Sequence, residues 1–517
     1  MTAPITRGRG MGRAPGGPAR PAPGVAVEWV GPLFRPLTGR RGDIAGFAGF
    51  ASRGPVQTPM RLVAAGEFDA AFGPSPDGSF LADAVHGFFA NGGTTCWVVR
   101  AARRAAAATA DTASGPRIRF TATSPGVWAD DLTIDLQPAG GDRFALTLRA
   151  PDGRVEVWRN LTVETLPERF APDATGTVSA LVTAELLDGA GPVTPSRTVL
   201  AGGDDGLAGV TTADLAGPDA GAALLDDIAE IGLVVVPDLL LRRSSADEGL
   251  PRFGPDEIAD AQARLVAAGE LLRDRVVLLS HPDSEALADD VVAWRDGFDS
   301  GFAALYWPWL RTDDPARPGE ARAVPPGGHV AGVIARSDHA AGPHKPPANE
   351  IVAGAVGVTV PVDDDRHGQV NEQGVNAIRP LPGRGVRVLG ARTTSTEPQW
   401  RYLNVRRLLN EIEGTIAGEA SWLVFEPDAT ELRDTLQRVV RQFLDDLWRA
   451  GGLDGGTAEE AYSVVIDESG AAGSDGRLIV EIGVRPPWPA EFVVVRIAVT
   501  ETGASGAGEG DDGGLDR

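Results

Sequence analysis

The histidines are the side chains of this sequence with the clearest capacity for acid–base or metal chemistry. They are His86, His281, His329, His339, His344 and His367. Asp338 and His339 shortly precede His344, but their spacing matches neither the HExxH pattern nor the paired CxxC pattern of zinc sites. The GxxxxGKS/T phosphate loop and the GxSxG nucleophile motif do not occur either. We therefore predict no catalytic residue, no metal site and no cofactor, and we expect a protein that is not an enzyme.

Acidic runs and the single cysteine are the remaining candidates for chemistry. The runs at 204–205, 226–227 and 363–365 are interpreted as turn or surface groups, because even the last one lacks the full ligand loop of a calcium site. Cys96 is the only cysteine, so no intramolecular disulfide can form. It lies in the apolar run TTCWVVR, which is typical of a buried structural thiol.

Composition excludes several classes of partner. The chain of 517 residues is too long for one compact core, so several domains are expected. Its net charge of −23 argues against a nucleic-acid partner, which requires a basic face. No apolar run reaches the length of about 18 residues that a membrane span requires, so no membrane insertion is expected. Residues 1–23 have no apolar segment behind their arginines and indicate a disordered arm, not a secretory signal.

The order of the periodic segments predicts an α/β protein that is interrupted by a β-rich stretch. Residues 44–73 read as two strands around a Gly-Pro turn and then a short helix, and a helix over 81–90 and a buried strand over 96–101 follow. After an Ala/Thr/Arg-rich linker, residues 118–187 contain mostly strand patterns, with Asp152-Gly153 as a hairpin turn. The α/β rhythm then resumes, with a helix expected from about Ala222.

Two amphipathic helices are predicted near the C-terminus, the first capped at Thr396 and the second at Asp428. Their apolar stripes are Tyr402, Val405, Leu409, Ile412 and Ile416, and Leu432, Leu436, Val440, Phe443 and Leu447. Their opposite, solvent-facing sides are expected to contain Arg401, Arg406 and Arg407, and Arg433, Arg438 and Arg441. These arginines either form an ordinary solvated face or dock an acidic protein surface.

Both ends of the chain contain short strands that are apolar on both faces. The predicted strand residues are Val25, Val27 and Trp29, and Phe492, Val493, Val494, Val495 and Ile497. Such a strand needs cover on both sides. Each one either folds back onto a sheet of its own chain or pairs with the sheet of a neighbour, which would build a polymer.

Several motifs resemble those of contractile tail sheath proteins, the family that forms the outer sleeve of myophage tails, R-type bacteriocins and extracellular contractile injection systems. The similar segments include GFFANGGTTCWVVR, SPGVWADDLTIDL, LYWPWL and GVNAIRPLPGRGVRVLGART. The residues that match the family motifs are Asn376, Arg379, Gly390, Arg392, Asn404, Arg406 and Arg407. Leu389 departs from the pattern, because the family commonly has tryptophan there.

The resemblance implies an α/β and α+β multidomain fold whose C-terminal sheet is completed by arms of neighbouring subunits. The implied parts are a discontinuous core of 24–104 and 200–389, an inserted outer β-rich domain of 105–199, a C-terminal domain of 390–502 and a disordered acidic tail of 503–517. Subunits would form stacked hexameric rings around an inner tube, and contraction would drive that tube through a target envelope. The alternative is a surface binding module that does not polymerise and recognises a ligand through the inserted domain.

The resemblance also implies the partners and the place of the protein. The partners would be further copies of the chain, an inner tube protein, and baseplate and terminal cap proteins. Arg433, Gln437 and Arg441 are the candidate contacts to the tube. The protein would assemble in the cytoplasm and become part of a phage tail or an injection particle.

Overall fold

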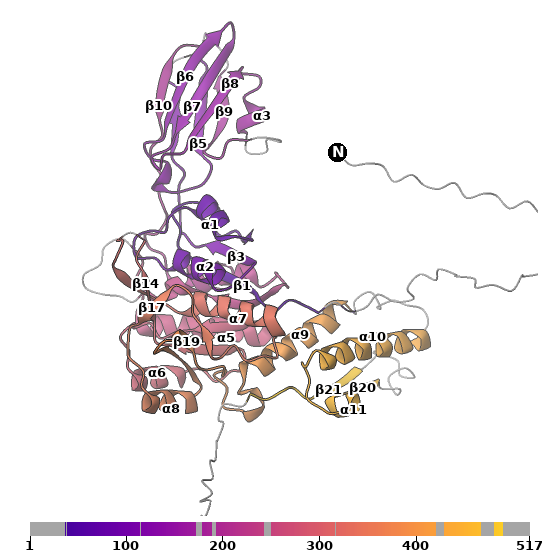
Figure 1. Ribbon diagram of the computed structural model, residues 1–517. Helices are drawn as coiled ribbons and strands as arrows, with labels where there is room; N and C mark the ends of the chain where they lie inside the picture. The colour runs from indigo at the N-terminus through magenta and orange to yellow at the C-terminus, as the bar shows by residue number, and fades with distance from the viewer. Residues whose placement is uncertain are drawn as a thin grey trace, which may run out of the picture.

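The computed structural model describes residues 37, 39–113, 115–171, 178–188, 193–241, 250–315, 317–419, 429–466 and 480–489. For residues 419 and 429–433 only the backbone is described. These residues form a mixed α/β architecture with several separate sheets (Figure 1). The strands predicted at the two chain ends, over 25–30 and 492–500, lie outside the described residues.

A nine-stranded sheet forms the centre of the molecule. Its strands, in order across the sheet, are β16 (Glu350–Ile351), β19 (Gly385–Val388), β18 (Val375–Leu381), β13 (Ala303–Trp307), β12 (Val276–Leu279), β11 (Ile231–Val235), β1 (Ile44–Gly49), β3 (Cys96–Arg100) and β2 (Met60–Leu62). The strands from β18 to β3 are parallel, and antiparallel strands flank them on both sides. Cys96 is buried in β3, which confirms the prediction of a structural thiol.

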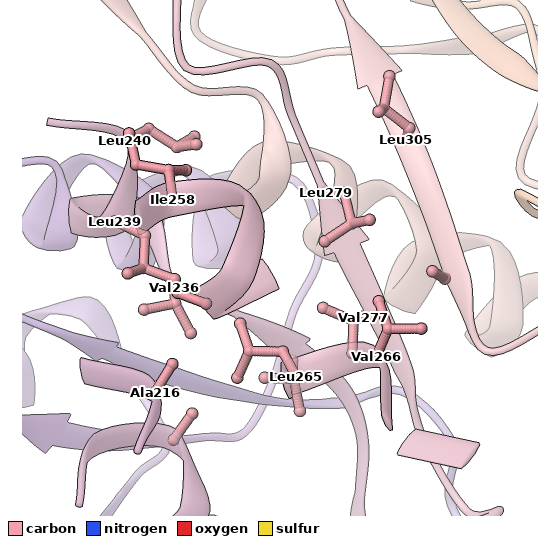
Figure 2. Packing of buried hydrophobic residues seen from close by; sticks show 14 of the residues in the cluster. Ala216, Val236, Leu239, Leu240, Ile258, Leu265, Val266, Val277, Leu279 and Leu305 are labelled. Atoms are coloured by element: carbon pink, nitrogen blue, oxygen red, sulfur yellow. The ribbon is translucent and has the colours of Figure 1, made fainter. Parts of the chain in front are cut away.

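Helices cover both faces of this sheet. One face packs against α1 (Ala65–Phe72), α2 (Leu81–Ala90) and α7 (Gly327–Ala341). The other packs against α4 (Thr212–Ala216), α5 (Pro255–Leu272), α6 (Ala288–Arg295), α8 (Asp364–Glu372) and the 3-10 turns η2 (Gly221–Leu225) and η3 (Pro237–Leu240). Because side chains alternate along a strand, Val276 and Leu278 of β12 join the first layer and Val277 and Leu279 the second. Figure 2 shows the second layer, where Leu265 of α5 belongs to the same buried cluster.

The segment between β3 and α4 leaves the central sheet and forms a β-rich unit with a hydrophobic cluster of its own (Figure 1). One of its sheets contains β4 (Thr109–Asp111), β5 (Arg117–Ala122) and β9 (Val182–Asp188). The other contains β10 (Ser196–Val199), β6 (Thr133–Gly140), β7 (Arg143–Arg149) and β8 (Val155–Leu161), and the short helices η1 (Val127–Ala129) and α3 (Pro167–Phe170) complete the unit. β7 and β8 pair antiparallel across Asp152-Gly153, which confirms the predicted hairpin.

Smaller elements complete the described chain. A three-stranded sheet contains β14 (Leu310–Asp313), β15 (Ala321–Val324) and β17 (Ala355–Val358). The C-terminal unit contains α9 (Leu403–Glu419), α10 (Ala429–Arg449), α11 (Ala458–Ala461), β20 (Tyr462–Ile466) and β21 (Val480–Val484), preceded by the 3-10 turn η4 (Pro398–Trp400). Among the described residues, no helix has both the length and the apolar character that a membrane crossing needs.

Two predicted helix starts are wrong. The helix expected from Ala222 is only the 3-10 turn η2, because the backbone hydrogen bonds here span three residues, as from the Asp226 N–H to the Ala223 carbonyl, and further turns follow up to β11. The capping box expected at Thr396 does not form. The Thr396 hydroxyl donates to Asp299 at 2.6 Å instead, and the α-helix begins later, at Leu403.

Asp238 of η3 joins three segments at the end of β1 and the start of α2. Its buried carboxylate accepts the backbone N–H groups of Phe50 and Phe80, both at 2.6 Å, and the Ser79 hydroxyl. Burial raises the pKa of Asp238 to about 6, and these hydrogen bonds oppose the rise. Asp238→Ala leaves the buried donors unpaired, so we expect a loss of about 3 kcal/mol in the free energy of unfolding. Urea denaturation measures it, and exposed Asp227→Ala is the control, with a loss below about 0.5 kcal/mol.

Candidate functional site at helix α9

Helix α9 connects the core of the central sheet to the core of the C-terminal unit. Residues 403–408 are all buried. Leu403 belongs to the cluster beneath α2 and α7, whereas Leu408 and Ile412 belong to the cluster of the C-terminal unit. These first turns of α9 have no solvated face, so the predicted wet side with Arg406 and Arg407 is wrong, whereas Glu413 farther along the helix is exposed. We call α9 and the side chains that hold it the α9 joint.

Arg407 is the centre of the α9 joint. Its guanidinium donates to Asp338 of α7 in a two-pronged ion pair, with 2.8 Å between Nη1 and Oδ1, and to the carbonyl oxygen of Gly42 at 3.0 Å. Both charged side chains are less than a tenth exposed. Burial lowers the pKa of Arg407, but Asp338 more than compensates, so the net pKa is raised and the cation is secured. One side chain thus ties α9 to α7 and to the segment before β1.

Arg406 is held by aromatic rings. Its guanidinium lies 4.6 Å from the centre of the Phe302 ring and 4.7 Å from that of Trp400. It also donates to Asn410 at 2.8 Å and to Glu413 at 3.1 Å. Burial lowers its pKa, and the Glu413 carboxylate opposes that change. The arginine therefore fixes the start of α9 against the strand that begins after Phe302.

Asn376 organises the chain that leads into α9. Its side-chain amide donates to the carbonyl oxygens of Leu305 and Arg392, and its Oδ1 accepts the Arg392 N–H at 2.7 Å. A Cβ at Gly390 would lie 2.7 Å from that same Oδ1, so glycine is required by the close approach. Arg392 continues this network by donating to the Asn371 carbonyl at 2.7 Å. Arg379 lies farther along β18 and ties that strand to α8 through Asp364 at 2.8 Å.

The described root of the N-terminal segment, residues 37 and 39–43, lies along α9. The Arg40 N–H donates to the Thr415 hydroxyl at 2.8 Å, and its guanidinium pairs with Asp274 at 3.2 Å. Leu37 packs against the hydrophobic cluster of the C-terminal unit. The described N-terminal end of the chain is therefore anchored along α9.

The other end of the described chain is attached to the beginning of the same helix. The Asn404 side chain donates to the carbonyl oxygens of His344, at 2.8 Å, and Pro487, at 3.2 Å. The Trp488 and Tyr402 rings meet edge-on with centres 5.6 Å apart. The roots of both chain ends are therefore fixed on α9.

The C-terminal unit contains a sheet of only two strands. β20 and β21 pair antiparallel from Tyr462–Val484 to Ile466–Val480. Val464 is buried against α10, whereas Val465 is 56% exposed. In the described part of the chain, the outer edge of each strand is unpaired. A two-stranded sheet is marginal by itself, and its free edges are templates for further strands.

The predicted contacts on α10 are only partly described. Arg441 is exposed, donates to the Val464 carbonyl at 3.4 Å and thus leans towards β20. Gln437 is half-buried, and the Arg433 side chain lies outside the described part. None of these positions tests the prediction of a tube contact.

Asp338 is the residue of the α9 joint whose role the sequence did not reveal. Beside His339 and His344 it suggested loose metal-ligand chemistry, whereas in the structure it neutralises Arg407. Asp363 likewise caps α8 by accepting the Arg366 N–H at 2.9 Å. Within the described ranges, no group of three or more metal-ligating side chains is present.

Family comparisons match the region that contains the α9 joint. The phage tail sheath protein central domain matches residues 256–394, and the phage tail sheath C-terminal domain matches residues 395–500. Residues 256–500 belong to the phage tail sheath family. The boundary between the two matched domains, at residues 394–395, thus lies shortly before α9. No curated protein matches the sheath chain by sequence.

Solved sheath structures share the fold across most of the chain. The sheath tail protein of Listeria innocua has a TM-score of 0.58 and 15% identity, over 87% of this chain and 96% of that one. The sheath tail protein of Desulfitobacterium hafniense has a TM-score of 0.57 and 16% identity, over 86% and 93%. The PVC sheath complex, from an extracellular contractile injection system in its contracted state, has a TM-score of 0.55 and 20% identity, over 93% and 98%.

Proposed function

We propose that this chain is the sheath subunit of a contractile tail-like machine. It polymerises as stacked hexameric rings around an inner tube and contracts to drive the tube through a target envelope. The observation that supports this most is the β20–β21 sheet, whose two edges are unpaired in the described chain, in a unit that also holds the roots of both chain ends. Such a subunit has places for added strands and can supply strands to others.

The lengths of the terminal segments agree with exchange between subunits. Residues 1–36 precede the described root, and an extended chain of that length spans at most about 120 Å. Residues 490–517 follow Pro489 and span at most about 90 Å. The apolar strands lie at the inner ends of these segments, because Val25 is 12 residues before Leu37 and Thr500 is 11 residues after Pro489. Each strand therefore extends at most about 40 Å from its root, which suffices for a sheet of an adjacent subunit.

The units of the chain have different tasks in this proposal. The core, 24–104 with 200–389, forms the body of the ring, and the C-terminal domain, 390–502, faces the tube. The inserted domain, 105–199, faces outwards, in agreement with its own hydrophobic cluster and its position away from the central sheet in Figure 1. Contraction is a switch between two sets of subunit contacts and requires no catalytic site. Baseplate and cap proteins close the ends of the polymer, which belongs to a phage tail or an injection particle.

Electron microscopy of the purified protein tests the proposal. We expect tubes or stacked rings when the sheath chain is mixed with a tube protein from the same source. A uniform monomer at high concentration, both with and without that tube protein, would contradict the proposal. That result would favour a binding module that uses the β-rich unit.

The tube contact requires a separate test. Arg433→Glu together with Arg441→Glu reverses two charges on α10, and we expect co-assembly to need about tenfold more tube protein. Cosedimentation measures this requirement. Arg143→Glu, an exposed reversal in β7, is the matched control and leaves co-assembly unchanged. Equal co-assembly of the double variant and the parent would remove these arginines from the tube contact.

A further inference from the structure

Glu411 lies where the root of the N-terminal segment crosses α9. Its Oε2 atom is buried and has no hydrogen-bond partner among the described residues. A Cβ added at Gly39 would lie 2.8 Å from Oε1 and 3.9 Å from the Phe443 ring, so the backbone of the root covers the carboxyl group directly. A carboxyl group that is enclosed without a donor is costly to ionise.

The charged groups around Glu411 already have partners. They are Arg40, Arg41 and Asp43 on the root, Asp338 and His339 on α7, Asp274 before β12, and Arg407 on α9 itself. Each of the three arginines is paired with one aspartate, namely Arg40 with Asp274, Arg41 with Asp43, and Arg407 with Asp338. The Nε2 atom of His339 lies 3.6 Å from Asp43. Glu411 is therefore the fourth carboxyl group beside three cations.

The cavity beside Glu411 leaves little room for water. The cavity that Glu411 lines with Arg40, Asn410 and Arg407 has a volume of about 10 Å³. This volume is at the lower limit for a single water molecule. The Oε2 atom of ionised Glu411 thus has neither a described cation nor a described donor beside it while the root is closed, although the residue as a whole is only half-buried.

The pKa of Glu411 reflects these surroundings. Burial and then repulsion by Asp338 raise it from 4.5 to about 7, Arg407 lowers it in part, and Asp43 adds to the rise. When the root opens, water reaches the carboxyl group and the pKa returns towards its ordinary value. The closed state therefore binds the proton more tightly than the open state, so closure is most stable below about pH 4.5 and weakens as the pH rises to about 7.

We propose that Glu411 is a pH-sensitive latch for the N-terminal segment. Neutral Glu411 lets residues 39–43 close over α9, and ionised Glu411 favours their opening. The latch is a property of the single subunit. If the latch opens, the N-terminal strand can extend farther from its own subunit, so its reach depends on pH. This consequence for assembly rests on the function proposed above.

Hydrogen–deuterium exchange of the full-length subunit, kept below the concentration at which it polymerises, tests the latch. The readout is the peptide that contains residues 39–43, whose Arg40 N–H donates to Thr415. After correction for intrinsic exchange, we expect opening to increase about tenfold between about pH 5.5 and 8.5, with about thirtyfold as the upper bound of a single coupled proton. Glu411→Gln, which stays neutral, should show the same protection at both pH values.

Glu270→Gln is the control, because it removes one exposed negative charge on α5, away from the root. It should keep the pH dependence of the parent. Asp43→Asn is an independent variant that removes a negative charge that raises the pKa of Glu411. The pH at which half of the change in exchange has occurred should therefore be lower than in the parent. Three results would each overturn the latch: a parent without pH dependence, an unchanged dependence in Glu411→Gln, or an unmoved midpoint in Asp43→Asn. The test reads one subunit, so its failure is distinct from a failure to polymerise.

Discussion

Deletion of residues 492–517 is expected to give a folded subunit that no longer polymerises. The deletion removes the predicted donor strand but keeps Pro487 and Trp488, which contact Asn404 and Tyr402. A strand that adds to an open edge forms several main-chain hydrogen bonds, each worth about 0.5–1.5 kcal/mol. Loss of a few of them at every subunit contact raises the critical concentration for assembly by at least about 100-fold. Electron microscopy and sedimentation over a concentration series measure this change.

A shorter deletion separates the strand from the tail that follows it. Removal of residues 503–517 deletes only the glycine-rich acidic tail, and assembly should remain at the concentration of the parent. Circular dichroism should show the same content of helix and strand in both truncated chains. Tubes formed by the 492–517 deletion at the parent concentration would show that the C-terminal segment is not a donor strand.

The central fold could be predicted from the sequence because its signals are local. The continuous apolar runs at 276–279 and 303–307 form strands buried on both faces. Helix α2 ends at Ala90, as expected for the helix over 81–90, and Gly92 just after it has a φ of 109° that favours glycine. In each case the residues that decide the structure are neighbours in sequence.

The α9 joint could not be predicted in the same way. Helical periodicity assumes that a polar side faces water, yet Arg407 faces Asp338, which lies 69 positions earlier in the chain. Thr396 similarly prefers Asp299, 97 positions away, to the backbone of the next helix. Periodicity contains no information about such distant partners. The family motifs did identify Asn376, Gly390 and Arg407, but as positions and not as contacts.

Arg407→Ala is expected to be the most destabilising single substitution in the α9 joint. It leaves Asp338, which is 9% exposed, without its cation, and it removes the donor to the Gly42 carbonyl. Breaking a buried ion pair on one side costs about 3–5 kcal/mol. Chemical denaturation should show this loss in the free energy of unfolding. Arg366→Ala is the control, because that arginine is 48% exposed and its ion pair with Asp363 is long, at 4.0 Å, so the loss should stay below about 1 kcal/mol.

A double substitution separates the lost attraction from the stranded charge. Arg407→Met combined with Asp338→Leu removes both charges, and a buried pair replaced by apolar groups of similar size is often close to neutral. The double variant should therefore recover at least about 1 kcal/mol relative to Arg407→Ala. If Arg407→Ala is within about 1 kcal/mol of the parent, the ion pair does not hold the joint. The attachment of α9 would then rest on Leu403, Leu408 and Ile412, whose burial links the two cores.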